Sequence, residues 1–323
     1  MSFSPVRLPG ALPDLRPMLA TPGPLPVDTE ADWGFEVKWD GARCILNAPG
    51  DGTLRILNRG GHEVTGTYPE LGALGEQLRG RPAVLDGEVV VLDEGGRPDF
   101  GLLQQRVGIF NPRRTAHLAM KYPAHLMLFD VMFLDGESLL TVPYRERRAV
   151  LSGLDLNGRN WSTPAHLEGH ARQAWDATLR HGFEGVVCKE LSSLYIPGVV
   201  SPRWRKVKHL LTLEVLIGGW TEGRGALAGL PGAILAGIPE ANGLRYVGAV
   251  GTGFSDEERR LLGSYLAALP RADSPFASPV GASDAHWVEP RLVAEISYTG
   301  WTTGRQMRNA VWNRLRPDLT LPG

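Results

Sequence analysis

The hydrophobic pattern divides the chain into two regions. In the first region, apolar runs that suit buried strands alternate with segments of helical spacing. The predicted strands are 33–48 with an interruption at Asp40-Gly41, 53–58, 83–92, 125–134 and 184–189. The predicted helices are 68–78, 143–154 and 167–181, and the proline-rich residues 1–32 are expected to form loops. This alternation predicts a mixed α/β domain.

The second region, after Lys208, has shorter strands separated by glycine-rich turns. Strands are predicted at 211–217, 231–238, 244–250 and near 286–298. A helix is predicted over Ser255–Leu269, where Ser255 is the N-cap and Glu258 completes a capping box. Short strands with one helix are typical of a small β-barrel such as an OB-fold. The fold class is therefore α+β, with domains expected at 1–209 and 210–323.

Length and composition agree with a folded protein of two domains. The chain has 323 residues, a hydrophobic fraction of 43% and a net charge of −1. Its two cysteines, Cys44 and Cys188, exclude a cysteine zinc site and a disulfide framework. The N-terminus has no apolar signal segment, and the uncharged stretch 225–239 is too short to cross a bilayer. A cytoplasmic protein with no membrane contact is expected.

The basic residues are almost all arginine. Only five of the 34 are lysine: Lys38, Lys121, Lys189, Lys206 and Lys208. Arginine stays protonated in proteins, whereas a lysine can lose its proton and react as an amine. The basic residues gather at 106–121, 145–148, 203–209 and 305–316. Each cluster is either a solvated charged segment or a face that binds phosphate, which a near-zero net charge does not exclude.

Lys38 lies in the segment EVKWDGAR, beside the interruption of the first predicted strand. A neutral lysine amine is a good nucleophile toward phosphorus, and burial and nearby cations favour the neutral form. Lys206 and Lys208 would supply those cations if the fold brings them close. The alternative is an ordinary surface lysine beside a turn.

Six short segments, in order along most of the chain, resemble the motifs of the covalent nucleotidyltransferases. They are EVKWDGAR, LNRGG, LDGEVV, LFDVMFLDG, EGVVCK and WRKVK. The chain looks most like the short bacterial ATP-dependent DNA ligases. That resemblance implies an adenylation domain, an ATP-grasp-like nucleotidyltransferase, followed by an OB-fold domain. It also implies ATP and Mg²⁺ or Mn²⁺ as cofactors, nicked duplex DNA as substrate, a monomeric state and other repair proteins as partners.

The resemblance assigns a role to each motif. Lys38 would carry AMP, and the nick between a 5′-phosphate and a 3′-hydroxyl would be sealed through a DNA-adenylate. The other roles are Glu36 and the Val37 backbone on adenine, Arg43 near the ribose or the nick phosphate, Arg59 on the nick 5′-phosphate, Glu88 on ribose or metal, Phe129 stacking on adenine, Glu184 on magnesium, and Lys206 and Lys208 on the AMP phosphate.

Several of these residues have a plainer interpretation. Phe129 could be a core aromatic, and Glu88 and Glu184 could be ordinary carboxylates beside turns. Lys189 completes its motif but could be a solvated charge at the end of a strand. Lys121 belongs to no motif and is expected to be exposed or to contact phosphate.

The last motif departs from the family pattern. Arg308, Arg316 and Asp318 match it, but a His-Pro pair and a final lysine are missing. That lysine is expected to orient pyrophosphate, so its absence puts the efficiency of self-adenylation in question. Arg314 is a candidate substitute.

Three alternatives stay open. An RNA ligase or a capping guanylyltransferase would use a similar lysine motif. A non-catalytic module that binds DNA nicks or ends would keep the fold, and the altered last motif is its support. An NAD-dependent ligase is disfavoured because the zinc cysteines are missing.

Overall fold

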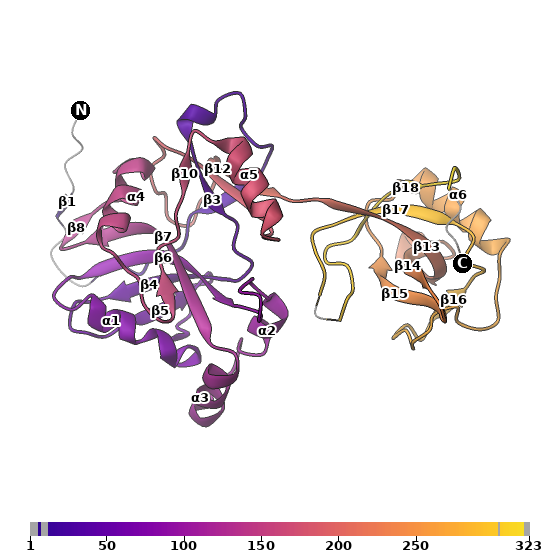
Figure 1. Ribbon diagram of the computed structural model, residues 1–323, viewed down its shortest axis with the longest axis horizontal. Helices are drawn as coiled ribbons and strands as arrows, with labels where there is room; N and C mark the ends of the chain where they lie inside the picture. The colour runs from indigo at the N-terminus through magenta and orange to yellow at the C-terminus, as the bar shows by residue number, and fades with distance from the viewer. Residues whose placement is uncertain (1–5, 8–11, 303, 320–323) are drawn as a thin grey trace. The chain divides into compact units, whose positions relative to one another are not determined.

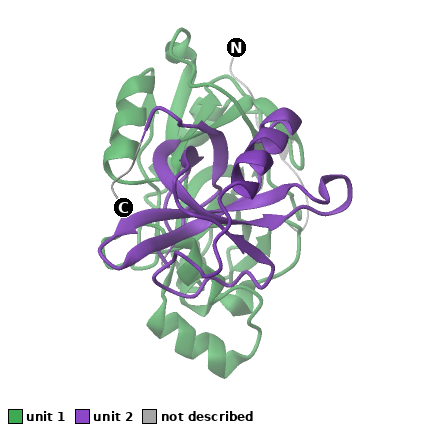
Figure 2. Ribbon diagram, turned by 90° about the vertical axis from the view of Figure 1, so that its right-hand side faces the viewer, with its two compact units in different colours: residues 1–208 green, residues 209–323 purple. Residues whose placement is uncertain are grey.

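A computed structural model describes residues 6–7, 12–302 and 304–319. The chain divides into two compact units, Met1–Lys208 and His209–Gly323, which Figure 2 shows in green and purple. Each unit has its own sheets and hydrophobic clusters. In the described part of the chain, no helix is long and apolar enough to cross a membrane.

The first unit contains two β-sheets. The first sheet has the order β1-β8-β7-β6-β4-β5, with β9 beside β7. Its strands are β1 (Val6–Arg7), β4 (Ala42–Ala48), β5 (Arg55–Asn58), β6 (Ala83–Val91), β7 (Ala124–Leu134), β8 (Glu137–Ser138) and β9 (Trp161–Ser162). The second sheet has the order β10-β3-β11-β12-β2. Its strands are β2 (Leu19–Pro22), β3 (Trp33–Val37), β10 (Leu167–Glu168), β11 (Gly185–Glu190) and β12 (Val200–Lys208).

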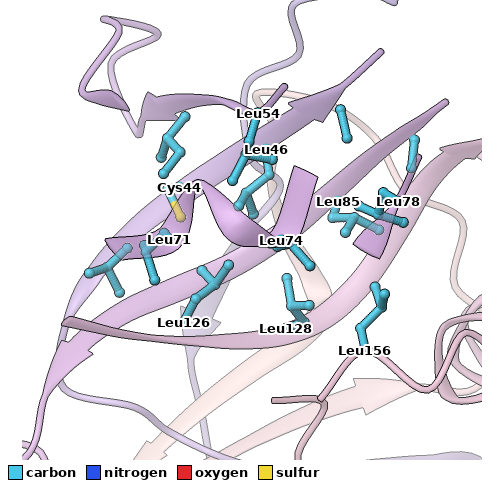
Figure 3. Packing of buried hydrophobic residues seen from close by; sticks show 14 of the residues in the cluster. Cys44, Leu46, Leu54, Leu71, Leu74, Leu78, Leu85, Leu126, Leu128 and Leu156 are labelled. Atoms are coloured by element: carbon cyan, nitrogen blue, oxygen red, sulfur yellow. The ribbon is translucent and has the colours of Figure 1, made fainter. Parts of the chain in front are cut away.

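The helices of this unit are α1 (Ala73–Gln77), α2 (Phe100–Gln104), α3 (Pro112–Lys121), α4 (Tyr144–Gly153) and α5 (Ala171–Arg180), with 3₁₀ turns η1 (Glu30–Asp32), η2 (Thr65–Thr67) and η3 (Pro69–Leu71). Most of them pack against the two sheets, whereas α3 contacts η2 and η3. Figure 3 shows leucines of η3 and α1 against the first sheet. Ala171 and Ala174 of α5 pack on the second sheet.

A third cluster joins the two sheets. Ile45 and Val84 of the first sheet are fully buried with Trp204 of the second. Side chains alternate between the two faces of a strand, so the same strands present other residues to the outer clusters. The inner faces of the two sheets therefore meet each other, and this contact is where charged residues of both sheets come together.

The second unit is a six-stranded sheet with one long helix. Its strand order is β15-β14-β13-β17-β18, with β16 beside β13. The elements are β13 (Leu211–Glu222), η4 (Gly225–Leu227), β14 (Pro231–Glu240), β15 (Gly243–Val250), α6 (Asp256–Ala267), β16 (Ala285–Trp287), β17 (Val293–Tyr298) and β18 (Val311–Leu315). The predicted capping box is confirmed, because Ser255 and Glu258 each accept the other's backbone N–H.

Most predicted elements exist, and the errors have local causes. The chain breaks between β3 and β4 at Asp40-Gly41 as expected. The helix predicted over 68–78 is wrong as one helix: it forms η3 and the short α1, in a segment that contains Pro69, Gly72 and Gly75. The helix predicted from 167 begins at Ala171, since Gly169 adopts a φ of +70°.

Other errors are elements that were not predicted. The loop expected over 1–32 contains β2, and WRKVK lies in the strand β12. The helices α2 and α3 were missed because α2 has only five residues and α3 is mostly exposed, with Thr115 as its one fully buried residue. The confirmed fold class is mixed α+β with a β-rich second unit.

The cluster on the outer face of the first sheet yields a stability prediction. Leu85 on β6 is fully buried, so Leu85→Ala should lower the free energy of unfolding by roughly 2–5 kcal/mol. Leu179 on α5 is 44% exposed, and Leu179→Ala is the matched control with little expected change. Urea unfolding compares the two variants, and equal losses of stability would contradict the assigned core.

Candidate active site

A cavity of about 300 Å³ lies between the inner faces of the two sheets of the first unit. It collects residues from β2, β3, β11 and β12 of one sheet and from β4, β6 and β7 of the other. Its lining is Leu19, Ala20, Pro22, Glu36, Val37, Lys38, Trp39, Arg43, Arg59, Glu88, Phe129, Val187, Lys189, Val200, Trp204 and Lys206. Most of the residues singled out in the first domain of the sequence are therefore neighbours.

Strand register explains this assembly. On β11, Lys189 pairs with Trp204 of β12, Val187 with Lys206 and Gly185 with Lys208. Alternate residues of a strand share a face, so Trp204, Lys206 and Lys208 project to one side. Val187 also pairs with Glu36 of β3, which adds the Glu36 side chain to that face. A spacing of two residues in WRKVK thus places the Trp204 ring and Lys206 at the cavity, with Lys208 next along the same face of β12.

Lys38 directly follows β3, and its backbone N–H donates to the carbonyl of Gly185 at 3.0 Å. Its Nζ contacts Glu184 Oε2, and Lys208 Nζ lies 2.8 Å from Glu184 Oε1. Burial alone would raise the pKa of Glu184, but Lys38 and Lys208 outweigh it and lower that pKa. The Glu184 carboxylate therefore bridges Lys38 and Lys208, which the fold brings close together as expected.

Glu36 is the centre of a second network. Its carboxylate is 7% exposed and accepts a hydrogen bond from the Tyr144 hydroxyl at 2.6 Å. Lys189 Nζ lies 2.8 Å from the other carboxylate oxygen, Oε2, and Arg148 Nε lies 3.7 Å from Oε1. Burial and the Glu36 carboxylate raise the pKa of the Tyr144 hydroxyl, which keeps it a donor. Glu36 is thereby fixed in orientation, with each carboxylate oxygen facing a donor.

Lys189 is not the solvated strand-end charge that was one interpretation of the sequence. It is 1% exposed, and its Nζ lies 4.4 Å from the Trp204 ring centroid and 4.6 Å from that of Phe129. Burial lowers the pKa of Lys189 although Glu36 and Asp130 oppose the shift. An ammonium among ring faces and a carboxylate retains favourable electrostatic contacts without water.

Phe129 lies on β7 at the cavity wall and is 7% exposed. The guanidinium of Arg43 lies 4.5 Å from its ring centroid. Asp86 holds that guanidinium with two hydrogen bonds, at 2.6 Å from Nε and 2.8 Å from Nη2. Phe129 is therefore both a nearly buried aromatic and a cavity residue.

Glu88 on β6 pairs in register with Arg43 of β4 and lines the cavity. Burial raises the pKa of the Glu88 carboxyl to about 7, with Arg43 and Lys38 opposing the shift and Asp86 and Glu184 adding to it. This carboxyl therefore changes charge near neutral pH.

Two of these carboxylates would suit a magnesium ion that is held together with a phosphate-bearing ligand. No group of three or more His, Cys, Asp or Glu in the described ranges could hold a metal by itself. Mg²⁺ is commonly held by one or two carboxylates together with substrate phosphates and waters. Glu184 and Glu88 supply that number, and each is within electrostatic reach of Lys38.

The remaining candidates are placed as follows. Arg59 is exposed after β5 and lines the cavity. In the second unit, Arg316 pairs with Asp318 at 2.8 Å, and this contact lowers the pKa of Asp318 to about 2. Arg314 pairs with Glu295 at 2.9 Å, and Arg308 follows the β17 strand on a loop.

Sequence reasoning missed part of the cavity. Trp204 and Trp39 line it without having been singled out, and Tyr144 reaches Glu36 from α4, outside every motif. The two-residue spacing of Trp204 and Lys206 was a usable signal for Trp204. Tyr144 had none, because its contact joins residues 108 positions apart.

Comparison with known proteins places both units in the family that the sequence motifs resemble. Residues 17–208 match the family described as ATP dependent DNA ligase domain, and residues 228–319 match the ATP dependent DNA ligase C terminal region. The multifunctional non-homologous end joining protein LigD of Mycobacterium bovis is 41% identical over 308 residues, which is 94% of this chain and 39% of that protein. The corresponding protein of Pseudomonas aeruginosa is 36% identical over 89% of this chain and 34% of its own length.

A solved structure covers almost the same length. The ligase domain from M. tuberculosis LigD is 39% identical, covers 95% of this chain and 96% of its own, and has a TM-score of 0.57. The expected architecture, an adenylation domain followed by an OB-fold domain, is confirmed. The chain spans about two fifths of the length of the M. bovis LigD protein.

The Glu88 carboxyl yields a pH prediction. Its raised pKa means that the folded chain holds a proton that the unfolded chain releases above about pH 4.5. Stability of the wild type should therefore decrease relative to Glu88→Gln as the pH rises from about 4.5 to about 7. Urea unfolding of both proteins at pH 5 and pH 8 measures this difference, and a difference that does not change with pH would contradict the burial of Glu88.

Proposed function

The chain belongs to the ATP-dependent DNA ligase family, and from that membership we propose that it seals nicks in duplex DNA with ATP. We assign adenylation to residues 1–209 and the OB-fold role to 210–323. The observation that carries the proposal is the position of Lys38 in a cavity with a stacking ring, two further lysines and two carboxylates. A lysine that carries AMP needs charged groups around the phosphate and a ring face beside the purine.

In the first step, the Nζ of Lys38 attacks the α-phosphorus of ATP. A nitrogen–phosphorus bond forms, the bond to the bridging oxygen breaks, and pyrophosphate leaves. The amine must first lose a proton to water, once its contact with Glu184 Oε2 is released. Lys206 lines the cavity and offers a cation to the phosphate oxygens, where charge stabilisation and alignment lower the barrier.

Glu184 and Glu88 would hold the magnesium ion. When bound, the ion would neutralise phosphate charge and compete with Lys38 for the Glu184 carboxylate. The Lys208 ammonium, which already pairs with Glu184, would remain to orient that carboxylate.

In the later steps, AMP passes from Lys38 to DNA and is then released. An oxygen of the 5′-phosphate at the nick attacks the phosphorus of the lysyl adenylate, and the nitrogen–phosphorus bond breaks. The 3′-hydroxyl then attacks the DNA phosphate, and AMP leaves with the phosphodiester formed. Arg59, exposed at the cavity, is the candidate for the nick phosphate.

Glu36 favours adenine over guanine. Adenine presents an amino group at position 6, a hydrogen-bond donor, whereas guanine presents a carbonyl oxygen there. Tyr144 donates to one oxygen of Glu36 and Lys189 Nζ lies against the other, so this carboxylate acts as a hydrogen-bond acceptor. This disfavours the guanylyltransferase alternative.

In the second unit, we keep Arg308, Arg316 and Asp318 as candidates for pyrophosphate handling in the first step. Arg314 is 62% exposed at its side chain and is the nearest replacement in sequence for the missing lysine. The names of these relatives include end joining, and we propose DNA repair with other repair proteins as the setting of this ligase.

A bypass substrate tests the role of Lys38. Lys38→Ala should form no enzyme–AMP and should fail to seal a 5′-phosphate nick with ATP, because the nucleophile is gone. The same variant should still seal a nick that already carries AMP on its 5′-phosphate, since that step does not use the lysine amine. Arg172→Ala, on α5 and outside the cavity lining, is the control and should adenylate and seal normally. An AMP adduct on Lys38→Ala would overturn the proposal, and an RNA nick sealed in preference to the DNA nick would favour the RNA ligase alternative.

Nucleotide choice tests the role of Glu36. Glu36→Gln gives position 36 an amide that can donate to the guanine carbonyl, so the ratio of AMP to GMP adduct should decrease by roughly 10-fold or more, the scale of one charge-assisted hydrogen bond. Parallel labelling with ATP and GTP measures the ratio, with Glu168→Gln, a partly exposed carboxylate on β10 outside the cavity lining, as control. An unchanged ratio in Glu36→Gln would remove Glu36 from nucleotide selection.

A further inference from the structure

The helix α3 and the loop before it carry a charge pattern that the proposed chemistry does not use. The chain has 35 acidic residues, but none lies between 100 and 129. In that range Arg113, Arg114, His117 and Lys121 are all exposed on α3. Within the part of the chain that the structure describes, no carboxylate forms an ion pair with these four residues.

Helical spacing brings these side chains together. Arg114, His117 and Lys121 are separated by three and four residues, so they form one stripe along the helix. Arg113 lies beside Arg114 in the first turn of the helix. Figure 1 shows α3 projecting from the edge of the first unit.

The arrangement costs the helix stability. Arg113 and Arg114 fill the first turn, where the helix dipole favours acidic residues and disfavours cations. The first turn has no acidic residue to compensate. Because the helix dipole disfavours cations at this end of the helix, their presence indicates a partner that supplies negative charge.

The surface continues toward the catalytic cavity. Arg59 lines the cavity, the exposed segment Gly60–Glu63 follows it, and the chain then enters η2, which contacts α3. The six residue-to-residue steps from Arg59 to Thr65 span at most about 20 Å, the length of roughly six base pairs of duplex. One duplex segment can therefore meet both places.

We propose that α3 binds the phosphate backbone of the duplex that flanks the nick, and that Arg113, Arg114, His117 and Lys121 make the contact. The proposal rests on the function proposed above and adds to it a surface that provides grip away from the chemistry. Phosphate contacts position a protein on DNA without reading its sequence, so this contact serves any nick. Phe110 and Met120 are also exposed here, and a protein partner is the competing use of the surface.

A matched pair of variants tests this contact. Arg114→Gln with Lys121→Gln removes two cations from α3, and Arg172→Gln with Arg180→Gln removes two exposed arginines from α5, where Glu30 and Asp176 adjoin them. Binding of the AMP-loaded chain is measured on a nicked duplex whose 3′ end lacks the hydroxyl, across a range of salt. The α3 pair should bind roughly 10- to 60-fold more weakly at 0.1 M salt, with a salt slope smaller by about 1 per removed cation.

The α5 pair should bind like the wild type, and all proteins should form enzyme–AMP at the same rate. Wild-type affinity in the α3 pair would overturn the proposal and leave the surface to a protein partner. Equal losses in both pairs would overturn it too, because net charge alone would then explain them. If the wild type itself formed no adduct, the proposed function would fail instead, and the proposal would fail with it.

Charge reversal separates binding from stability. Arg113→Glu with Arg114→Glu places acids where the helix dipole favours them, so the melting temperature should stay the same or rise. The affinity for the nicked duplex should decrease in the same variant. A lower melting temperature with unchanged affinity would show that the arginines serve the fold and would contradict the DNA contact.

Discussion

The burial of charge between two β-sheets is the constraint on which this site depends. An ionised side chain removed from water costs several kcal/mol unless a partner of opposite charge is fixed beside it. The fold meets this condition with pairs across strands: Lys189 with Glu36, Arg43 with Asp86, and Glu184 with Lys38 and Lys208. Because each pair fixes two side chains, the cavity is organised before a nucleotide enters.

The same pairs divide the cavity into two ends with different tasks. At one end, Glu36 with its donors and the ring of Phe129 form a rigid, acceptor-bearing wall that suits a purine amino group. At the other end, Glu184 connects Lys38 to Lys208, and these charges can change partners when phosphates arrive. In the resting chain the Lys38 amine is held by the Glu184 carboxylate, and this contact must be released before the amine can attack phosphorus.

Much of this arrangement could be predicted from the sequence, and the reason is periodicity. The apolar runs gave β6, β7 and β11, and the resemblance of EVKWDGAR and WRKVK to ligase motifs pointed to Lys38, Lys206 and Lys208 as neighbours. Contacts that depend on tertiary packing were not predictable. Tyr144 reaches Glu36 from a helix far along the chain, and the burial of Lys189 depends on rings from three elements.

The missed α3 has a different cause. Its pattern is polar and its one fully buried residue is Thr115, so no apolar periodicity marks it as a helix. The sequence showed its cations but could not show that they share a stripe, or that no carboxylate in the described fold neutralises them. Charge composition became informative only once the helix gave the residues a common face.

The central claim is that the Lys38 amine becomes bonded to the phosphorus of AMP. The most direct measurement is the intact mass of the wild-type chain after incubation with ATP and magnesium, followed by peptide mapping and a second mass after addition of nicked duplex DNA. The account predicts a single AMP per chain, located on the peptide that contains Lys38 and lost when the nicked DNA is added. An adduct on Lys189, Lys206 or Lys208, or a chain that never gains mass, would contradict it.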